Sequence, residues 1–230
     1  MLKTSLRILL LALALPFAMP VAAQDQRPGI AVLPYEDGGS YGRDKEDFAA
    51  LSKGIPAMLI SGLSRNPAAR VVERSSIRQM LDEQNLAEAG RVDAATAARI
   101  GKLVGARYMI MGVFTDFYGK FRIDSRIVDV ETGEILEVVS VGPEPRDELY
   151  QLINSTAEQI MANTNLPPLP QEVATLAQNR AVPAEALTYY SRALLYQDRG
   201  ETDKAIEFYT RALEVFPDYA EAREGLQRVQ

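Results

Sequence analysis

The chain has 230 residues and contains neither cysteine nor histidine. The absence of cysteine excludes disulfides, thiol nucleophiles and the lipid attachment of bacterial lipoproteins, which requires a cysteine at the cleavage point. The absence of histidine excludes histidine-based catalytic triads and zinc sites built on histidine. Such a chain must draw its stability from a hydrophobic core, and its length suffices for one ordinary domain and something smaller.

Apolar runs long enough to span a bilayer as a helix are also missing. The longest candidate, Ile8–Leu15, is too short for a span and follows the basic residues Lys3 and Arg7. Small residues then lead to a cut between Ala23 and Gln24. This pattern predicts a cleavable signal peptide over residues 1–23. We therefore expect a periplasmic protein that is not a lipoprotein and has no transmembrane span in its mature chain.

Basic residues are fewer than acidic ones, 25 against 31. The whole chain has a net charge of −6, and removal of the signal peptide, which carries two basic residues and no acidic one, changes this to −8. That charge argues against nucleic acid or an anionic membrane face as a partner. The Gly-rich stretch 38–42 lacks the lysine and the frame of a phosphate-binding loop, and no cofactor is indicated.

Alternating strand and helix patterns predict an α/β domain over residues 24–165. The first half is expected to contain the following elements: a buried strand at 29–35, a loop at 36–45, a helical stripe of Phe48, Leu51, Ile55, Leu59 and Leu63 whose regular helix starts near Pro56, a strand at 70–73, a helix capped by Ser75 or Ser76 with Ile77, Met80 and Leu81 inward, and a loop at 86–92. Proline cannot sit in a straight helix interior without losing a hydrogen bond, which is why the helix is placed after it.

The stretch from Asp93 to Val141 organises this domain. Asp93 is placed to cap a helix that Gly105 ends, with Ala97, Ile100, Leu103 and Val104 as its apolar stripe. The continuous apolar run 108–114 is typical of a central strand covered on both faces. Later elements are expected as an alternating strand at 121–127, a turn at 131–134, a return strand at 135–141 ended by Gly142-Pro143, and a helix at 146–163. The order β-α-β-α-α-β-β-β-α implies a mixed sheet, because short turns join the last three strands.

A different composition follows the proline-rich segment that begins at Leu166. We expect a linker over 166–182 and a small all-α unit over 183–230, made of two helices joined at 198–200 and a cap helix at 218–229. This unit resembles a tetratricopeptide repeat. The matching small, aromatic and proline positions are Tyr189, Ala193, Tyr196, Gly200, Ala205, Tyr209, Ala212 and Pro217. A lone repeat cannot bury its own face, so it should pack on the α/β domain, on another copy or on a partner.

Four segments of the α/β domain carry a second resemblance. They are IAVLPYED at 30–37, AMLISGLSRNPAARVVERSSIRQMLDEQ at 57–84, DAATAARIGKLVGARYMIMGVFTDF at 93–117 and RIVDVETGEILEV at 126–138. In this order they resemble the soluble domain shared by the curli-secretion channel family CsgG and the amino-terminal domain of TolB. The resemblance implies a mixed-sheet periplasmic domain without a catalytic centre. The connections at 118–120 and 131–134 leave no room for transmembrane hairpins, whose strands need about 9–11 residues each.

The expected function is a non-enzymatic module that binds other envelope proteins through the repeat and assists their assembly or secretion, with homo-oligomerisation through the α/β domain. The alternative is a regulatory binding protein acting on a cell-wall (peptidoglycan) synthesis enzyme. A hydrolase would need paired carboxylates, and Asp116, Asp124, Asp129, Glu131 and Glu134 along the hairpin offer candidates. Interleaved arginines favour a solvated strand face instead.

Candidate protein-binding residues of the repeat are Tyr190, Tyr196, Lys204, Glu207 and Arg211. Tyr190 lies off the repeat pattern and is expected to be exposed. Tyr196 stands at a standard position of the repeat, where packing inside the repeat is the favoured interpretation. The three charged residues share one helical face, and this pattern favours a solvated face over a binding surface.

Overall fold

A computed structural model describes residues 25–41, 45–84 and 92–230. The expected signal peptide and nearly all of the loop expected at 86–92 lie outside these ranges. Within the described residues, no helix is both long and apolar enough to cross a membrane.

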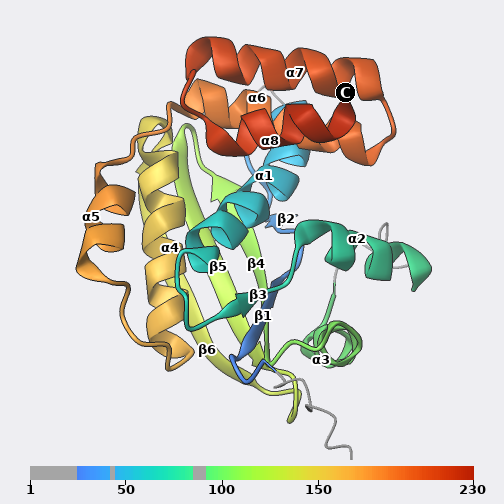
Figure 1. The fold of residues 1–230 in the computed structure, drawn as a ribbon, viewed down its shortest axis with the longest axis vertical. Helices are drawn as coiled ribbons and strands as arrows, with labels where there is room; N and C mark the ends of the chain where they lie inside the picture. Colours follow the sequence, from blue (N-terminus) through green and yellow to red (C-terminus); the bar gives the residue numbers. More distant parts are fainter. Residues whose placement is uncertain (1–24, 42–44, 85–91) are drawn as a thin grey trace, which may run out of the picture.

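The sheet is mixed, as the strand order predicts. Its strands are β1 (Gly29–Val32), β2 (Glu36–Asp37), β3 (Arg70–Val71), β4 (Tyr108–Asp116), β5 (Lys120–Asp129) and β6 (Ile135–Pro145). They lie in the order β3-β1-β4-β5-β6, with β2 beside β4, and β5 runs antiparallel to both of its neighbours, β4 and β6 (Figure 1). The strand β6 continues past Gly142-Pro143, which was expected to end it, through a cis peptide bond.

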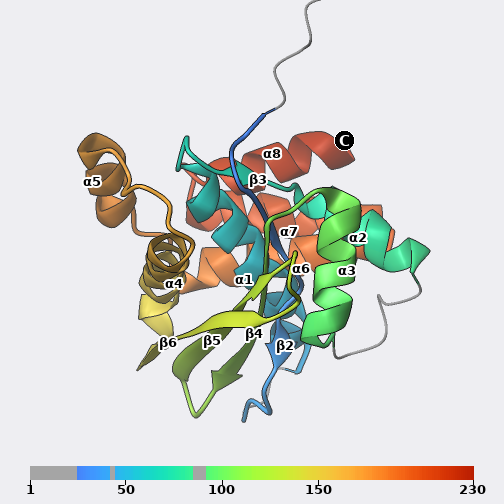
Figure 2. The ribbon, with the colours of Figure 1, turned by 90° about the horizontal axis from the view of Figure 1, so that it is seen from below.

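Helices cover both faces of this sheet (Figure 2). On one face, α1 (Lys45–Ser64) and α4 (Leu149–Asn163, preceded by a 3-10 turn at Arg146–Glu148) share a core with side chains of β1, β4 and β5. On the other, α2 (Arg74–Glu83) and α3 (Ala94–Val104) share a core with Met109 and Met111 of β4. The central strand is therefore buried between two helical layers.

Local signals in α3 are largely confirmed. The carboxylate of Asp93 accepts a hydrogen bond from the Thr96 N–H at 2.7 Å, and Gly105 ends the helix in the left-handed conformation at φ 67°. Leu103, expected on the buried stripe, is 55% exposed, because Gly101, on another side of the helix, is the residue that lies against Met109 and Val130. The cap predicted for α2 is wrong as well: Glu73 precedes the helix, and no side chain caps it.

The helix α1 begins eleven residues before Pro56, contrary to the expectation that it starts there. Pro56 has no N–H to bond the carbonyl of Ser52. The Tyr35 N–H donates a hydrogen bond to that carbonyl at 3.1 Å instead, so the helix is connected at this point to the segment that follows β1. The apolar stripe from Phe48 to Leu63 is buried as predicted.

The segment expected as a linker over 166–182 contains a helix, α5 (Gln171–Asn179). Leu166 and Val182, at the two ends of this segment, are buried and belong to the main core. The proline-rich stretch is thus packed against the α/β unit and does not separate two independent bodies.

The all-α unit consists of α6 (Ala184–Asp198), α7 (Thr202–Val215) and α8 (Ala220–Val229). Gly200, at φ +74°, makes the turn that joins the two helices of the hairpin. Of the three packing arrangements left open by the sequence, the structure shows the first: α6 lies directly across α1 (Figure 1). Gly54 of α1 lets the two helices approach, because a Cβ there would stand 1.8 Å from the Ser191 Oγ.

Candidate protein-binding groove

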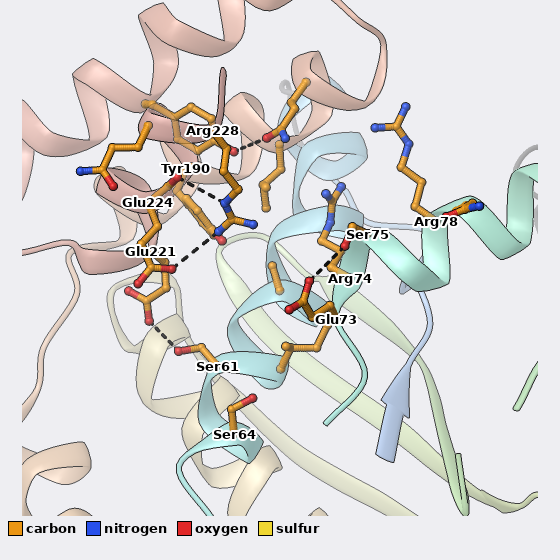
Figure 3. A pocket seen from close by; sticks show the side chains of 18 of the residues that line it. Ser61, Ser64, Glu73, Arg74, Ser75, Arg78, Tyr190, Glu221, Glu224 and Arg228 are labelled. Carbon is orange, nitrogen blue, oxygen red and sulfur yellow. Dashed lines mark hydrogen bonds and ion pairs between the residues drawn. The ribbon is translucent and has the colours of Figure 1, made fainter. Parts of the chain in front are cut away.

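A groove opens where the helical repeat meets the α/β unit. Its volume is about 1080 Å³, with α8 as one wall, α2 as the other and parts of α1 and α6 as the floor (Figure 3). The walls come from segments more than 100 residues apart in the sequence, so their meeting depends on the docking of α6 onto α1. Docking therefore creates a concave surface that neither unit has alone.

Two tyrosines with buried side chains lie at the floor of the groove. Tyr190 and Tyr209 line it beside Ala57 and Ile60, and the ring of Tyr190 lies 5.1 Å from that of Tyr219. Tyr190 is only 6% exposed, so the expectation that it is exposed is wrong. The reason is that α1 and α8 cover the side of α6 that the repeat pattern leaves uncovered. Burial raises the pKa of Tyr209 to about 12 and that of Tyr190 further, so both floor hydroxyls stay neutral.

The α8 wall is held by Glu221. Its carboxylate accepts hydrogen bonds from the Ser61 Oγ at 2.6 Å and from the Arg180 guanidinium, with an Nη1–Oε1 distance of 2.8 Å. Burial raises the pKa of Glu221, but the hydrogen bonds from Arg180 and Ser61 outweigh it and hold the pKa below its ordinary value. This wall is thus fixed to α1 and to the segment before α6.

The α2 wall is held by Asp198 at the end of α6. Its carboxylate pairs with Arg74 and, at 3.0 Å, with Arg78, while the Asp198 carbonyl accepts a second bond from Arg78 at 2.6 Å. Ser75 and Ser64 face the opening from α2 and α1 (Figure 3). The rim therefore carries charges of both signs over an aromatic floor.

Four of the five residues predicted to bind a partner lie outside the groove. Tyr196 is 8% exposed, stacks on Phe208 with ring centroids 5.4 Å apart, and donates a hydrogen bond to Glu46. On the exposed face of α7, Lys204 pairs with Glu201 and Arg211 with Glu207, both at 2.6 Å. The structure brings Tyr190 alone of the five to the groove, and nothing in it tests a binding role for the others.

Four of the five hairpin carboxylates have structural partners. Asp116 accepts a hydrogen bond from the Gly119 N–H at 2.6 Å, and Asp124 binds Arg122 and the Ser140 hydroxyl. Arg107 pairs with both Asp129 and Glu131. Over the described parts of the chain, no group of three or more acidic side chains could hold a metal ion. These carboxylates shape turns and pair cations, as the interleaved arginines indicate.

The backbone amides of the Gly-rich stretch also have hydrogen-bond partners within the chain. The side chain of Asp37 accepts hydrogen bonds from the N–H groups of Gly39, at 3.2 Å, and Ser40, at 2.8 Å. Both amides are thus occupied by a carboxylate that would repel a phosphate.

Sequence reasoning missed an exposed aromatic cluster as well as the groove. Tyr41, Phe117 and Tyr118 are 57%, 59% and 76% exposed, and their rings contact one another with centroids 5.2–6.0 Å apart. The last two follow one another at the β4–β5 turn, but Tyr41 reaches them from a loop more than 70 residues away. Only the fold shows that they form one cluster.

Comparison with known proteins finds two family models, each of which matches a part of the chain. Residues 20–125 match the family model described as the curli production assembly/transport component CsgG, and residues 186–219 match the tetratricopeptide repeat model. No curated protein matches the chain.

Three of the solved structures that match part of the chain are the following. The LpoB C-terminal domain from Escherichia coli is 18% identical with a TM-score of 0.38, and the match covers 50% of this chain and 80% of that one. TolB from Acinetobacter baumannii is 14% identical with a TM-score of 0.36, covering 71% of this chain and 31% of that one. Lipoprotein GNA1162 from Neisseria meningitidis is 17% identical with a TM-score of 0.39, covering 60% of this chain and 98% of that one. By the family models, residues 20–125 are similar to CsgG and residues 186–219 to a tetratricopeptide repeat, and the structure shows the second region docked on the first.

Proposed function

We propose that this protein is a non-enzymatic, periplasmic protein-interaction module that assists the assembly or secretion of cell-envelope components. The groove between α2 and α8 is the observation that carries this proposal. The family whose model matches residues 20–125 is described by its role in curli assembly and transport, and the repeat is of a kind that binds proteins, which both support it. Export by a signal peptide cleaved after Ala23 belongs to the same proposal.

The chemistry of the groove suits a segment of another protein. The floor combines Tyr190 with the apolar side chains of Ala57 and Ile60, and an apolar centre inside a polar rim is typical of interfaces. Arg74 and Arg228 on opposite walls stand among carboxylates, so the rim can pair with charges of either sign. A partner segment with one apolar side chain between polar ones would place that side chain against Tyr190.

Two adjacent serines of α2 provide the test. Ser75 lines the groove, whereas Ser76 is exposed but does not line it. We expect a photo-crosslinking amino acid at position 75, introduced in the native host, to capture an envelope protein that position 76 does not capture. Ser64 lines the groove from α1, and a crosslinker placed there should capture the same protein. The substitution Ser75→Trp should prevent this capture from position 64, and Ser76→Trp should not.

Equal capture from positions 75 and 76, or capture from position 64 that survives Ser75→Trp, would show that the groove is not the binding surface. The thermal unfolding midpoint of each variant, compared with that of the unsubstituted chain, shows whether a loss reflects misfolding.

The alternative, regulation of a cell-wall synthesis enzyme, is favoured by one feature: all walls of the groove come from a single chain, so a monomer can bind. Light scattering on the purified protein separates the two functions. A large homo-oligomer formed through the α/β unit would support assembly or secretion, and a monomer that crosslinks to a peptidoglycan synthase would support regulation.

A further inference from the structure

A second cavity, of about 500 Å³, lies beside the groove, between α1, α2 and the C-terminal end of α6. One part of its wall is apolar and consists of Val32, Pro34, Pro56, Ile77, Leu81 and Leu195. The remaining part is charged and consists of Lys53, Arg74, Arg78, Asp82, Asp198 and Arg199. Arg74, Arg78 and Asp82 also border the groove, so the two spaces share a wall.

Cations outnumber anions around this cavity. Four basic side chains face two carboxylates, which leaves a local excess of two positive charges in a chain whose net charge is −6. Asp198 is already shared between Arg74 and Arg78, and Asp82 reaches Arg78 only at 3.7 Å. The cavity is therefore a positive site on a negative protein, where an anion is attracted selectively.

Lys53 is a basic residue of this cavity that has no acidic partner among the described residues. It is half-buried on α1 and makes no hydrogen bond or ion pair within the described parts of the chain. Burial lowers the pKa of Lys53; Asp198 and Asp82 raise it, and Arg74 and Arg78 lower it further. A desolvated ammonium close to two guanidinium groups is unfavourable unless an anion offsets it.

Arg199 completes the charged wall from the α6–α7 turn. It is exposed, its guanidinium lies 5.7 Å from the ring centroid of Tyr196, and no carboxylate pairs with it within the described residues. Two cations without acidic partners thus border the same cavity from different elements.

We propose that this cavity binds a small organic anion, with its phosphate or carboxylate group held by Lys53, Arg78 and Arg199 and its apolar part against the apolar wall at Pro34. Such a ligand would touch α1, α2 and α6 at once. It would therefore stabilise the docking of the repeat, since binding to the docked state alone lowers the free energy of that state.

Calorimetry with phenyl phosphate, inorganic phosphate and phenol tests this proposal on the purified full-length protein. We expect phenyl phosphate to bind more tightly than inorganic phosphate and phenol not to bind. Lys53→Met should weaken phenyl phosphate binding at least about tenfold, the usual effect of losing one charged hydrogen-bond donor. Lys102→Met, which removes one positive charge from an exposed position on α3, should leave it unchanged.

Lys53→Met should also unfold at a temperature no lower than the unsubstituted protein, because it removes a cation that has no partner. Arg199→Met, at an exposed position, provides a second test that does not involve the helix interface, and should weaken binding as well. Absence of saturable phenyl phosphate binding would overturn the proposal, as would equal effects of Lys53→Met and Lys102→Met. Equal affinities for the two phosphates would overturn the ligand class, since the apolar wall would then contribute nothing.

Discussion

At the scale of single residues, the docked arrangement depends on close contacts on α1. Gly54 is the clearest case, because a Cβ at this position would stand 1.8 Å from the Oγ and 2.6 Å from the Cβ of Ser191. No L-residue with a side chain fits there unless α6 moves away. The repeat can therefore sit this close to the α/β unit only with glycine at position 54.

We expect Gly54→Ala to destabilise the protein by roughly 1–3 kcal/mol, as overpacking usually does. The gain in helix propensity, about 1 kcal/mol, opposes this but is the smaller effect. Urea denaturation measures the change in the free energy of unfolding. Adding Ser191→Gly removes the atoms that clash and should restore part of the loss, so a double variant no more stable than Gly54→Ala would refute this explanation.

Asp47 is a second residue of α1 on which the docked arrangement depends. Its side chain is 8% exposed and pairs with Arg192 at 2.6 Å and with Arg146 at 3.5 Å. Because Asp47→Asn leaves two partly buried guanidinium groups without a counter-charge, we expect a loss of about 1–3 kcal/mol in the free energy of unfolding. Glu207→Gln, which breaks an exposed pair on α7, serves as the control and should cost less than about 1 kcal/mol. Equal losses would mean that burial of the Asp47 pair contributes nothing.

At the scale of elements, Glu221 connects α8 to α1 and to the segment before α6. Its side chain is 14% exposed, and Ser61 and Arg180 both donate hydrogen bonds to its carboxylate. The folded protein holds the pKa of Glu221 below its ordinary value of 4.5. A group with a lowered pKa contributes stability above its unfolded pKa and loses that contribution as the pH falls through its folded pKa.

Glu221→Gln should therefore be less stable than the unsubstituted protein at pH 7. The difference in free energy of unfolding should shrink once the pH falls below 4.5. Chemical denaturation at a series of pH values measures it, and Glu224→Gln, at an exposed position of the same helix, should show no such trend. A difference that stays constant down to pH 3 would contradict the assigned role.

The order of strands and helices in the α/β unit was predictable, since each element has its own periodicity and local end signals such as Asp93 and Gly105. The start of α1 was not, because Pro56 is tolerated through a hydrogen bond between Tyr35 and Ser52, which no local pattern contains. The burial of Tyr190 was missed for a similar reason: the repeat pattern describes contacts within the hairpin, whereas α1 covers Tyr190 from outside. The groove itself could not be predicted, because its walls meet only through tertiary packing.

At the scale of the whole molecule, the two units share one core. Side chains of α1, α4, α6 and α7 belong to a single buried cluster, and the Tyr219 hydroxyl contacts the Met58 sulfur at 3.2 Å. A chain with two independent domains would unfold in two steps. We expect a single cooperative transition in differential scanning calorimetry, with equal calorimetric and van't Hoff enthalpies.

Removal of residues 183–230 should expose the apolar side of α1 around Met58. We expect the shortened chain to bind a hydrophobic dye and to unfold at a lower temperature than the full chain. Two separate transitions in the full chain, or a shortened chain that keeps the original midpoint, would show that the units are independent.

The position of α1 between the sheet and the repeat has a consequence for how its sequence can vary. Most helices of a globular protein present one side to solvent, and substitutions accumulate there with little effect. In α1, the buried face carries Leu51, Gly54, Ile55 and Met58, and of these Gly54 and Met58 contact the repeat. Random mutagenesis with selection for folded protein should therefore find few permitted exchanges on this face of α1, and many on the solvent side of α7. New properties would more readily arise in α7 than in the helix that joins the two units.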